Sequence, residues 1–416
     1  MRKLSLSKNK IRVLLLEGVH LSAVQHLADA GYTTIEEMPR ALAERDLIER
    51  LRGVHILGIR SRTQVTAEVL AGADRLIAVG CFCIGTNQVD LAAARRAGIP
   101  VFNAPFSNTR SVAELVMGEV VMLMRGIFEK SRAAHRGEWL KSAENSWEVR
   151  GKTLGIVGYG NIGAQLGLIA ESFGMRVLYF DHTDKLPLGN AQPVKTLAEL
   201  LAQSDAVSLH VPETSATAGM IGAAQIRDMR RGAFLVNASR GNVVDLDALA
   251  DALRGGHLLG AAIDVFPVEP KSSIEEFVSP LRGLPNVILT PHIGGSTAEA
   301  QARIGLEVAK KLADYSDVGA TFGAVEFPQV QLPPRPSGYR FMHMHRNAPG
   351  VLARVVEVFG RHGANIGAQY LQTDAEVGYL VLDADGEGDW DGAAILTELR
   401  AIPETIRARI LYGMGR

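Results

Sequence analysis

Residues 152–181 contain the stretch that most narrows the folds open to this chain. KTLGIVG (152–158) is a continuous apolar strand pattern, NIGAQLGLIAESFG (161–174) has helical spacing, and RVLYFD (176–181) is a second strand pattern. A glycine-rich turn stands between the first strand and the helix. A strand, such a turn, a helix and a second strand in so short a stretch predict a βαβ unit with two parallel strands.

The same alternation extends along the chain in both directions. Downstream strand patterns cover 205–212, 233–239, 260–266 and 286–292, and upstream ones cover 11–19, 55–61, 75–80 and 99–105. Short apolar runs separated by helical patterns are typical of parallel sheets that helices cover on both faces. The sequence therefore predicts an α/β protein with two doubly wound, Rossmann-like domains.

The length of 416 residues also requires more than one domain. A long amphipathic stretch, 111–137, leads from the first sheet to the second, and another, 297–315, leads away again. We therefore predict a discontinuous first domain, 1–107 with 298–330, into which the domain 108–297 is inserted.

A third, smaller domain is expected at the carboxyl end. FPQVQLPPRPSG (327–338) contains four prolines and no periodic pattern, so it is predicted to be a linker. Residues 338–416 then follow the order β-α-β-β-α-β, which is that of a ferredoxin-like unit.

Composition excludes several classes of partner. Lys plus Arg (44) nearly balances Asp plus Glu (45), so no overall field favours nucleic acid or a membrane surface. No run of 18 apolar residues occurs, and the amino terminus lacks the apolar region of a signal peptide. Cys81 and Cys83 are too close for an ordinary disulfide or for zinc-ligand spacing, so no metal site is expected. We expect a cytoplasmic protein.

The glycine-rich turn has the form G-x-G-x-x-G. With 43 glycines in the chain the motif alone is weak, but its position after a strand and before a helix is informative. Gly158 would make the tight turn, Gly160 would let the backbone approach a pyrophosphate, and Gly163 would allow close packing of helix on strand. The helix N-terminus would then receive the phosphates of a dinucleotide.

Asp181 ends the strand that follows this helix. A carboxylate there can accept hydrogen bonds from the adenine ribose and repels a 2′-phosphate, so NAD is expected rather than NADP. The alternative is a solvated charge at the end of a strand, and the cations His182 and Lys185 nearby could weaken the preference.

Three later segments carry ionisable groups past the ends of strands in the same sheet. NASRG supplies Arg240, DVFPVEP supplies Asp264 and Glu269, and TPHIGG supplies His292. The carboxyl ends of parallel strands meet at one edge, where open α/β sheets bind ligands. Taken singly, Arg240, Glu269 and His292 could be ordinary surface or turn residues.

Together these side chains suit hydride transfer to or from a secondary alcohol. Arg240 offers a planar fork for the carboxylate of a 2-oxo or 2-hydroxy acid. His292 would exchange the hydroxyl proton, and Glu269 would orient its ring. We expect the two glycines after His292 to leave room for substrate and nicotinamide.

Six motifs in order, GCFCIGTNQVD, NAPFSNTRSVAE, GYGNIG, NASRG, AAIDVFPVEP and LTPHIGGST, carry a resemblance over nearly the whole chain. The sequence resembles the D-isomer-specific 2-hydroxyacid dehydrogenases, and among them the members with a C-terminal ACT domain that begin serine synthesis from a phosphorylated 2-hydroxy acid. The resemblance implies Arg240, Glu269 and His292 as the catalytic set. It also implies cofactor contacts at Asn161, Ile162, Asp181, Ala238, Ser239, Arg240, Asp264, His292, Ile293, Gly294 and Gly295.

Cations are needed for the substrate phosphate. GIRSRTQVT supplies Arg60 and Arg62, and HRGEWLK supplies Lys141. The resemblance implies that Arg60 and Asn108 face the substrate. For each of these cations the alternative is an ordinary solvated surface residue.

The C-terminal unit is similar to an ACT domain, which in this family binds L-serine between two such domains. The resemblance implies effector contacts at His345, Asn347 and Asn365 and a homo-oligomer, a tetramer, with feedback inhibition by serine. The residues themselves also allow a plainer interpretation, in which Asn347 and Pro349 begin a helix and His345 is a surface ring.

Two other functions remain open from the sequence. The same residues would serve a reductase of another 2-oxo acid, such as 2-oxoglutarate or hydroxypyruvate. The fold also occurs in NAD-sensing binding modules, although this chain has no long basic or disordered tail.

Overall fold

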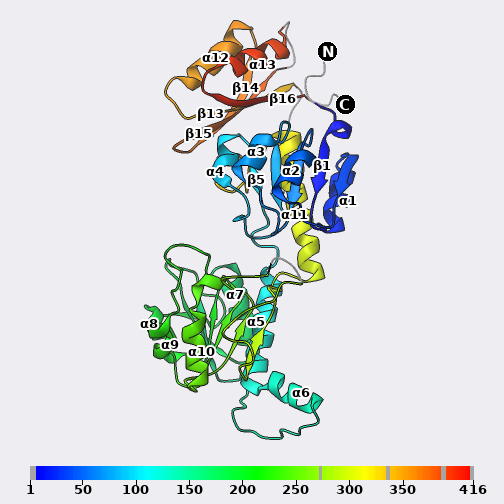
Figure 1. Ribbon diagram of the computed structural model, residues 1–416. Coiled ribbons are helices and arrows are strands. Elements are labelled where there is room, and N and C mark those ends of the chain that lie inside the picture. Colours follow the sequence, from blue (N-terminus) through cyan, green and yellow to red (C-terminus); the bar gives the residue numbers. More distant parts are fainter. Residues whose placement is uncertain (1–5, 271–273, 334–337, 386–389, 413–416) are drawn as a thin grey trace. The chain divides into compact units, whose positions relative to one another are not determined.

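The computed structural model describes residues 6–270, 274–333, 338–385 and 390–412. The chain divides into two compact units, Met1–Ser107 with Gln301–Arg416, and Asn108–Ala300 (Figure 1). Part of the predicted linker, residues 334–337, lies outside the described residues.

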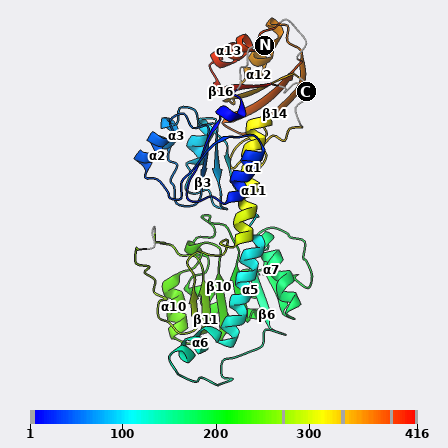
Figure 2. The ribbon, with the colours of Figure 1, turned by 90° about the vertical axis from the view of Figure 1, so that its right-hand side faces the viewer.

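The first unit begins with a five-stranded parallel sheet in the order β2-β1-β3-β4-β5. Its strands are β1 (Arg12–Leu15), β2 (Thr34–Glu37), β3 (Ile56–Ile59), β4 (Ala78–Cys81) and β5 (Val101–Phe102). Its helices are η1 (Lys8–Lys10), α1 (Leu21–Asp29), α2 (Glu44–Arg50), α3 (Ala67–Gly72), α4 (Leu91–Arg96) and most of α11 (Ala298–Val318). One apolar cluster joins α1 and α11 to one face of the sheet, and another joins α2, α3 and α4 to the opposite face (Figure 2). The predicted doubly wound architecture is confirmed here.

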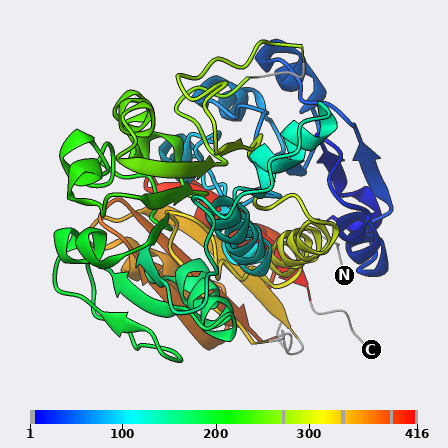
Figure 3. The same ribbon diagram turned by 90° about the horizontal axis from the view of Figure 1, so that it is seen from below.

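The second unit is built on a seven-stranded parallel sheet in the order β12-β11-β10-β9-β6-β7-β8. Its strands are β6 (Thr153–Val157), β7 (Arg176–Phe180), β8 (Gln192–Pro193), β9 (Ala206–Leu209), β10 (Ala233–Asn237), β11 (Leu258–Ile263) and β12 (Val287–Leu289). Its helices are α5 (Thr109–Arg125), α6 (Ile127–His135), α7 (Asn161–Ser172), α8 (Leu197–Gln203), α9 (Ala223–Asp228), η2 (Gly241–Val243) and α10 (Leu246–Arg254). Helices α5 and α7 lie side by side on one face (Figures 2 and 3), and α8, α9 and α10 share an apolar cluster with the other.

The long helix expected over 111–137 is interrupted. Gly126 adopts a left-handed backbone (φ 57°) that ends α5 and starts α6. Glycine takes this conformation without steric cost, so the chain can turn at Gly126, while Gly118 stays inside α5.

The order of the second sheet reverses between β6 and β9, which are paired neighbours. From β6 the chain continues to β7 and β8 on one side, and from β9 it continues to β10, β11 and β12 on the other. A crevice outside the carboxyl ends of strands at such a switch point is the usual ligand site of a doubly wound sheet. The glycine-rich G-x-G-x-x-G turn (the fingerprint, 158–163) and Asp181 follow strands of this sheet. So do the loops that carry Arg240, Glu269 and His292.

The C-terminal part of the first unit is a four-stranded antiparallel sheet in the order β14-β15-β13-β16. Its elements are β13 (Tyr339–Arg346), α12 (Val351–Arg361), β14 (Ile366–Thr373), β15 (Val377–Ala384), α13 (Gly392–Ala401) and β16 (Thr405–Tyr412). Both helices pack on one face around Phe341 and Phe359. The predicted ferredoxin-like order is confirmed. Among the helices that the structure describes, none has the length and apolar character needed to cross a membrane.

Candidate active site

The three fingerprint glycines meet different surroundings. Gly158 has φ 90°, and a Cβ added there would lie 2.3 Å from the carbonyl oxygen of His210. A Cβ on Gly163 would lie 2.3 Å from the carbonyl oxygen of Gly158. A Cβ on Gly160 would meet no protein atom within 4 Å. Two of the glycines are therefore fixed by packing within the protein, and the side of Gly160 is left open, as approach by a pyrophosphate requires.

Helix α7 starts directly at this turn. Asn161 and Ile162 form its first turn, and the cap position is Gly160, which has no side chain to accept hydrogen bonds from the first amides. Amides at a helix N-terminus that lack a capping side chain are suited to receive phosphate oxygens. The residues present fit the pyrophosphate of a dinucleotide.

Asp181 is held at the end of β7 beside the same turn. Its Oδ2 accepts a hydrogen bond from the amide of Tyr159 at 2.9 Å, and its Oδ1 accepts from the amide and hydroxyl of Thr183 at 3.0 and 3.1 Å. The side chain is only 8% exposed, so it is not a solvated strand-end charge. Burial opposes ionisation, but these hydrogen bonds lower the pKa of Asp181 below its ordinary value. The carboxylate is thus charged and fixed where a ribose is expected.

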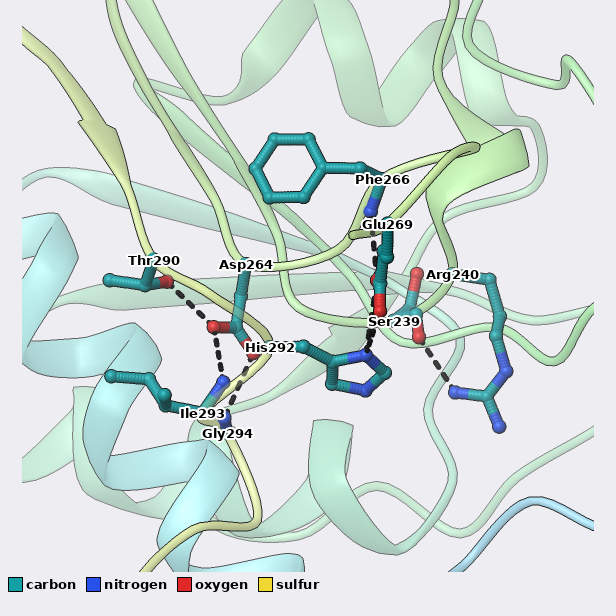
Figure 4. A network of polar contacts seen from close by, with 9 residues as sticks. All are labelled: Ser239, Arg240, Asp264, Phe266, Glu269, Thr290, His292, Ile293 and Gly294. Carbon is teal, nitrogen blue, oxygen red and sulfur yellow. Dashed lines mark hydrogen bonds and ion pairs between the residues drawn. The ribbon is translucent and has the colours of Figure 1, made fainter. Parts of the chain in front are cut away.

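Asp264, at the end of β11, organises the segment that carries His292 (Figure 4). Its Oδ1 accepts from the hydroxyl of Thr290 at 2.6 Å and from the amide of Ile293 at 2.8 Å, and its Oδ2 accepts from the amide of Gly294 at 2.9 Å. The side chain is almost fully buried. Its first role in the structure is therefore to shape the 290–294 loop.

His292 sits in that loop with a left-handed backbone (φ 53°), which is uncommon for a residue with a side chain. Its amide donates to the carbonyl oxygens of Asp264 and Thr290 at 2.9 and 3.0 Å. These bonds hold the strained conformation, which places the ring toward Glu269 (Figure 4).

Glu269 contacts one nitrogen of that ring. The Nδ1 atom of His292 lies 3.1 Å from Oε1 and 3.0 Å from Oε2 of Glu269, and Oε1 also accepts from the amide of Phe266 at 3.2 Å. The hydrogen bond to Glu269 raises the pKa of His292 although burial lowers it. Burial alone would raise the pKa of Glu269, but the hydrogen bond and charge of His292 bring it below its ordinary value. Since Glu269 occupies Nδ1, Nε2 is the nitrogen left to exchange a proton.

Arg240 follows β10 in the adjacent loop. One terminal nitrogen of its guanidinium donates to the carbonyl oxygen of Ser239 at 2.7 Å (Figure 4), and its own carbonyl oxygen accepts from the side chain of Asn237 at 2.9 Å. A Cβ on Gly241 would lie 2.0 Å from the carbonyl carbon of Phe266, so this loop packs directly on the one that carries Glu269. The positive charge of Arg240 adds a small contribution to the lowered pKa of Glu269, and it opposes the rise in the pKa of His292 without cancelling it. The three predicted catalytic side chains are thus brought together.

Close packing within the protein explains why glycine stands at positions 294 and 295, which the sequence alone did not show. A Cβ on Gly294 would lie 3.1 Å from Oδ2 of Asp264, and one on Gly295 would lie 2.8 Å from Nδ2 of Asn108. The loop therefore needs glycine at both positions to pack on Asp264 and Asn108. From the sequence, we expect these glycines only to leave room for ligands.

The predicted substrate residues are placed in different units. Asn108 precedes α5 in the second unit, and its Oδ1 is buried without a hydrogen-bond partner in the described structure. Lys141 lies in the same unit, in the exposed segment after α6. Arg60 and Arg62 follow β3 in the first unit, and no ion pair is recorded for either among the described residues.

The predicted effector residues are found at two ends of the C-terminal sheet. The ring of His345 is buried, and burial lowers its pKa, so it is no surface ring. Asn347 donates from Nδ2 to the carbonyl oxygen of Asp374 at 2.7 Å, and Asn365 donates to Oδ2 of Asp385 at 2.6 Å.

The alternative in which Asn347 and Pro349 begin a helix is wrong. The cap of α12 is Gly350, with φ 85°, and Asn347 makes no capping bond. The helix starts at Val351, after Asn347 and Pro349, because Gly350 can adopt the left-handed turn into it.

Sequence reasoning missed several residues of this site. Thr290 and Gly241 shape the loops of His292 and Arg240, and Glu119 on α5 lies buried close enough to Asp264 for their charges to interact. The glycine in NASRG and the acid in an otherwise apolar helix face were visible in the sequence, but only the packing shows what they contact.

Known proteins resemble this chain over nearly its whole length. Residues 117–294 match the family model described as D-isomer specific 2-hydroxyacid dehydrogenase, NAD binding domain, and residues 341–407 match an AHAS small subunit-like ACT domain. The chain is 57% identical over 410 residues to D-3-phosphoglycerate dehydrogenase of Haemophilus influenzae, with 99% of each chain covered. It is also 57% identical over 412 residues to D-3-phosphoglycerate dehydrogenase of Escherichia coli K12, covering 99% of this chain and all of that one.

A solved structure agrees with the fold. D-lactate dehydrogenase from Aquifex aeolicus, complexed with NAD and lactic acid, is 26% identical with a TM-score of 0.63. The match covers 73% of this chain and 95% of that one.

Proposed function

Since this chain belongs to the family of D-isomer-specific 2-hydroxyacid dehydrogenases, we propose that it oxidises D-3-phosphoglycerate to 3-phosphohydroxypyruvate with NAD, as the first step of L-serine biosynthesis. The observation that carries the proposal is the pairing of His292 Nδ1 with both oxygens of Glu269, next to the loop of Arg240. The chain covers nearly the full length of relatives named for this activity.

Bound NAD would supply the acceptor for the hydride that leaves C2 of the substrate. The phosphates fit the open turn at Gly160 and the start of α7, and Asp181 would hold the ribose. The fixed negative charge of Asp181 favours NAD, because a 2′-phosphate would be repelled.

The chain's own side chains then bind the substrate and move the proton. Arg240 binds the substrate carboxylate with its planar guanidinium. As the C2 hydride leaves, His292 takes the hydroxyl proton on Nε2, and the carbinol becomes a carbonyl. Glu269 keeps Nδ1 protonated and stabilises the imidazolium that results.

The substrate phosphate requires cations beyond this triad. We assign it to Arg60 and Arg62, with Asn108 facing the substrate and Lys141 as a further cation. Support comes from the lack of any ion pair recorded for either arginine in the described part of the chain, and from the unpartnered Oδ1 of Asn108. In domain terms, 1–107 with 298–330 would bind substrate, 108–297 would bind NAD and 338–416 would regulate.

We further propose that L-serine inhibits the enzyme by bridging two ACT domains. His345 is paired with Gly378 at one end of β15, whereas Asn365 bonds to Asp385 just past the other end. At the rise of a β-strand these ends are roughly 20 Å apart, too far for one serine to span. Asn365 of a second copy would therefore complete the site of His345 and Asn347, which favours a homo-oligomer, as in the proposed tetramer.

Steady-state assays test this function. NADH oxidation would be measured with 3-phosphohydroxypyruvate, hydroxypyruvate and 2-oxoglutarate, each with and without millimolar L-serine. The proposal expects the highest kcat/KM with the phosphorylated acid and inhibition by serine. A higher kcat/KM with an unphosphorylated acid would show that the protein is a reductase of another 2-oxo acid. Turnover indifferent to serine would remove the feedback assignment only.

A further inference from the structure

Glu17, shortly after β1, has an unusual backbone conformation. Glu17 has φ 65°, in the left-handed region that residues with side chains rarely occupy, and Gly18 follows with φ 62°. An outlier of this kind persists only where surrounding contacts hold it, and it often marks a functional segment. The contacts of Glu17 show what the conformation achieves.

The carboxylate of Glu17 accepts hydrogen bonds from three backbone amides of one loop. Its Oε1 accepts from the amides of Arg60 and Thr63 at 3.2 and 2.9 Å, and its Oε2 accepts from the amide of Arg62 at 3.0 Å. Bonds to an ionised acceptor are stronger than those between neutral groups. One side chain thus fixes the loop 60–63 after β3.

The opposite side of the same loop is held by Gln88. Its side-chain amide donates to the carbonyl oxygen of Arg60 at 2.7 Å, and the residue is buried. The peptide groups on both sides of Arg60 are therefore clamped, the amide by Glu17 and the carbonyl by Gln88. The guanidinium lies 3.5 Å from the main-chain oxygen of Glu17 and has no recorded carboxylate partner in the described residues.

We propose that Glu17 and Gln88 are positioning residues, which hold the Arg60 loop in the geometry that recognises the substrate phosphate. The inference rests on the proposed function, since it assigns these residues to the same phosphate site. Glu17 acts through the backbone and not by touching substrate. Its charge is directed at three amides, so Arg60 and Arg62 stay available to an external anion.

The test uses kinetics of the full chain with matched substrates. Glu17→Gln keeps the shape of the side chain but replaces one acceptor oxygen with a donor, and Gln88→Ala removes the clamp from the other side. Asp74→Asn is the control, because Asp74 accepts one backbone bond from Gly53 at 2.8 Å in the same sheet domain. KM and kcat would be measured with 3-phosphohydroxypyruvate and with hydroxypyruvate, which lacks the phosphate, and folding would be followed by thermal melting.

We expect Glu17→Gln to lose about tenfold in kcat/KM for the phosphorylated acid, mainly through KM, which is the scale of one lost bond to a charged group. Gln88→Ala removes a bond between neutral groups, so its loss should be smaller, about threefold. The KM for NADH, kcat/KM for hydroxypyruvate and the Asp74→Asn control should change little. In a background that carries both Arg60→Ala and Arg62→Ala, Glu17→Gln should cause almost no further loss, because its effect runs through these two arginines.

Three results would overturn this assignment but not the proposed function. They are equal losses with both acids, additive losses in the background that carries Arg60→Ala and Arg62→Ala, and clamp variants that behave like the control. Wild-type protein that does not reduce 3-phosphohydroxypyruvate would overturn the proposed function, and this assignment with it. If Glu17→Gln does not fold, Gln88→Ala decides between these outcomes.

Discussion

The Nδ1 atom of His292 lies almost equally far from the two carboxylate oxygens of Glu269, at 3.1 and 3.0 Å. A symmetric contact of this kind fixes the proton on Nδ1 and turns Nε2 outward as the reacting nitrogen. It also ties the protonation of His292 to the charge of Glu269, because each group stabilises the charged form of the other.

Replacing Glu269 with Gln should shift the pH profile. Reduction needs the imidazolium, so its rate falls as pH rises through the pKa of His292. Glu269 raises that pKa through its hydrogen bond to the ring, so its loss should move the alkaline limb to lower pH. The measurement is kcat against pH in the reductive direction. An unshifted limb would mean that another group sets it.

The fingerprint glycines offer a matched pair of variants. Gly158→Ala places a Cβ 2.3 Å from the oxygen of His210 on a left-handed backbone, so we expect a clear fall in melting temperature. Gly160→Ala meets no protein atom within 4 Å, so it should melt near wild type and lose NADH affinity instead. Melting curves and NADH titration by fluorescence check both. Normal NADH affinity in Gly160→Ala would argue against a pyrophosphate at this turn.

Asp181→Asn tests the choice of cofactor. Removing the charge removes the repulsion of a 2′-phosphate and weakens the bonds to a ribose. We expect the ratio of kcat/KM for NADH to that for NADPH to fall by about tenfold or more, equivalent to roughly 1.4 kcal/mol. An unchanged ratio would show that His182, Lys185 or another group sets the preference.

Glu119 gives a stability prediction. The residue is buried and neither carboxylate oxygen has a partner in the described structure, and burial, with the nearby Asp264, raises its pKa to about 8. The unfolded chain ionises this group near pH ~4.3. Between these values the unfolded state has lost the proton and the native state has kept it, so wild-type stability falls as pH rises.

Glu119→Gln cannot ionise and should escape that loss. The melting temperature of Glu119→Gln minus that of wild type should therefore become larger as the pH rises from about 5 to about 8. Glu114→Gln, on the same helix but exposed, is the control and should show no such trend. A constant difference between Glu119→Gln and wild type would mean that Glu119 is ionised in the native protein.

The sequence predicted most of the architecture because apolar runs dominate buried parallel strands. It missed β2 (Thr34–Glu37) and β8 (Gln192–Pro193), each of which lies at one edge of its sheet and is too polar to show that pattern. The break at Gly126 was also missed, because the helical pattern continues through it and only the backbone conformation reveals the turn.

For the site, residue types and their order along the chain predicted which loops meet, but not how. That Arg240, Glu269 and His292 share one sheet edge follows from parallel strands alone. The bonds from Asp264 to the backbone of Ile293 and Gly294, and from Glu17 to the loop of Arg60, depend on side-chain directions that no sequence pattern encodes.

The most direct test of the account compares NADH oxidation with 3-phosphohydroxypyruvate by wild-type protein and by His292→Gln. We expect turnover by wild type and a loss of about 10²–10⁴ in kcat for the variant, which is the range for a positioned acid-base group. Wild type without turnover on this acid, or a variant as fast as wild type, would contradict it.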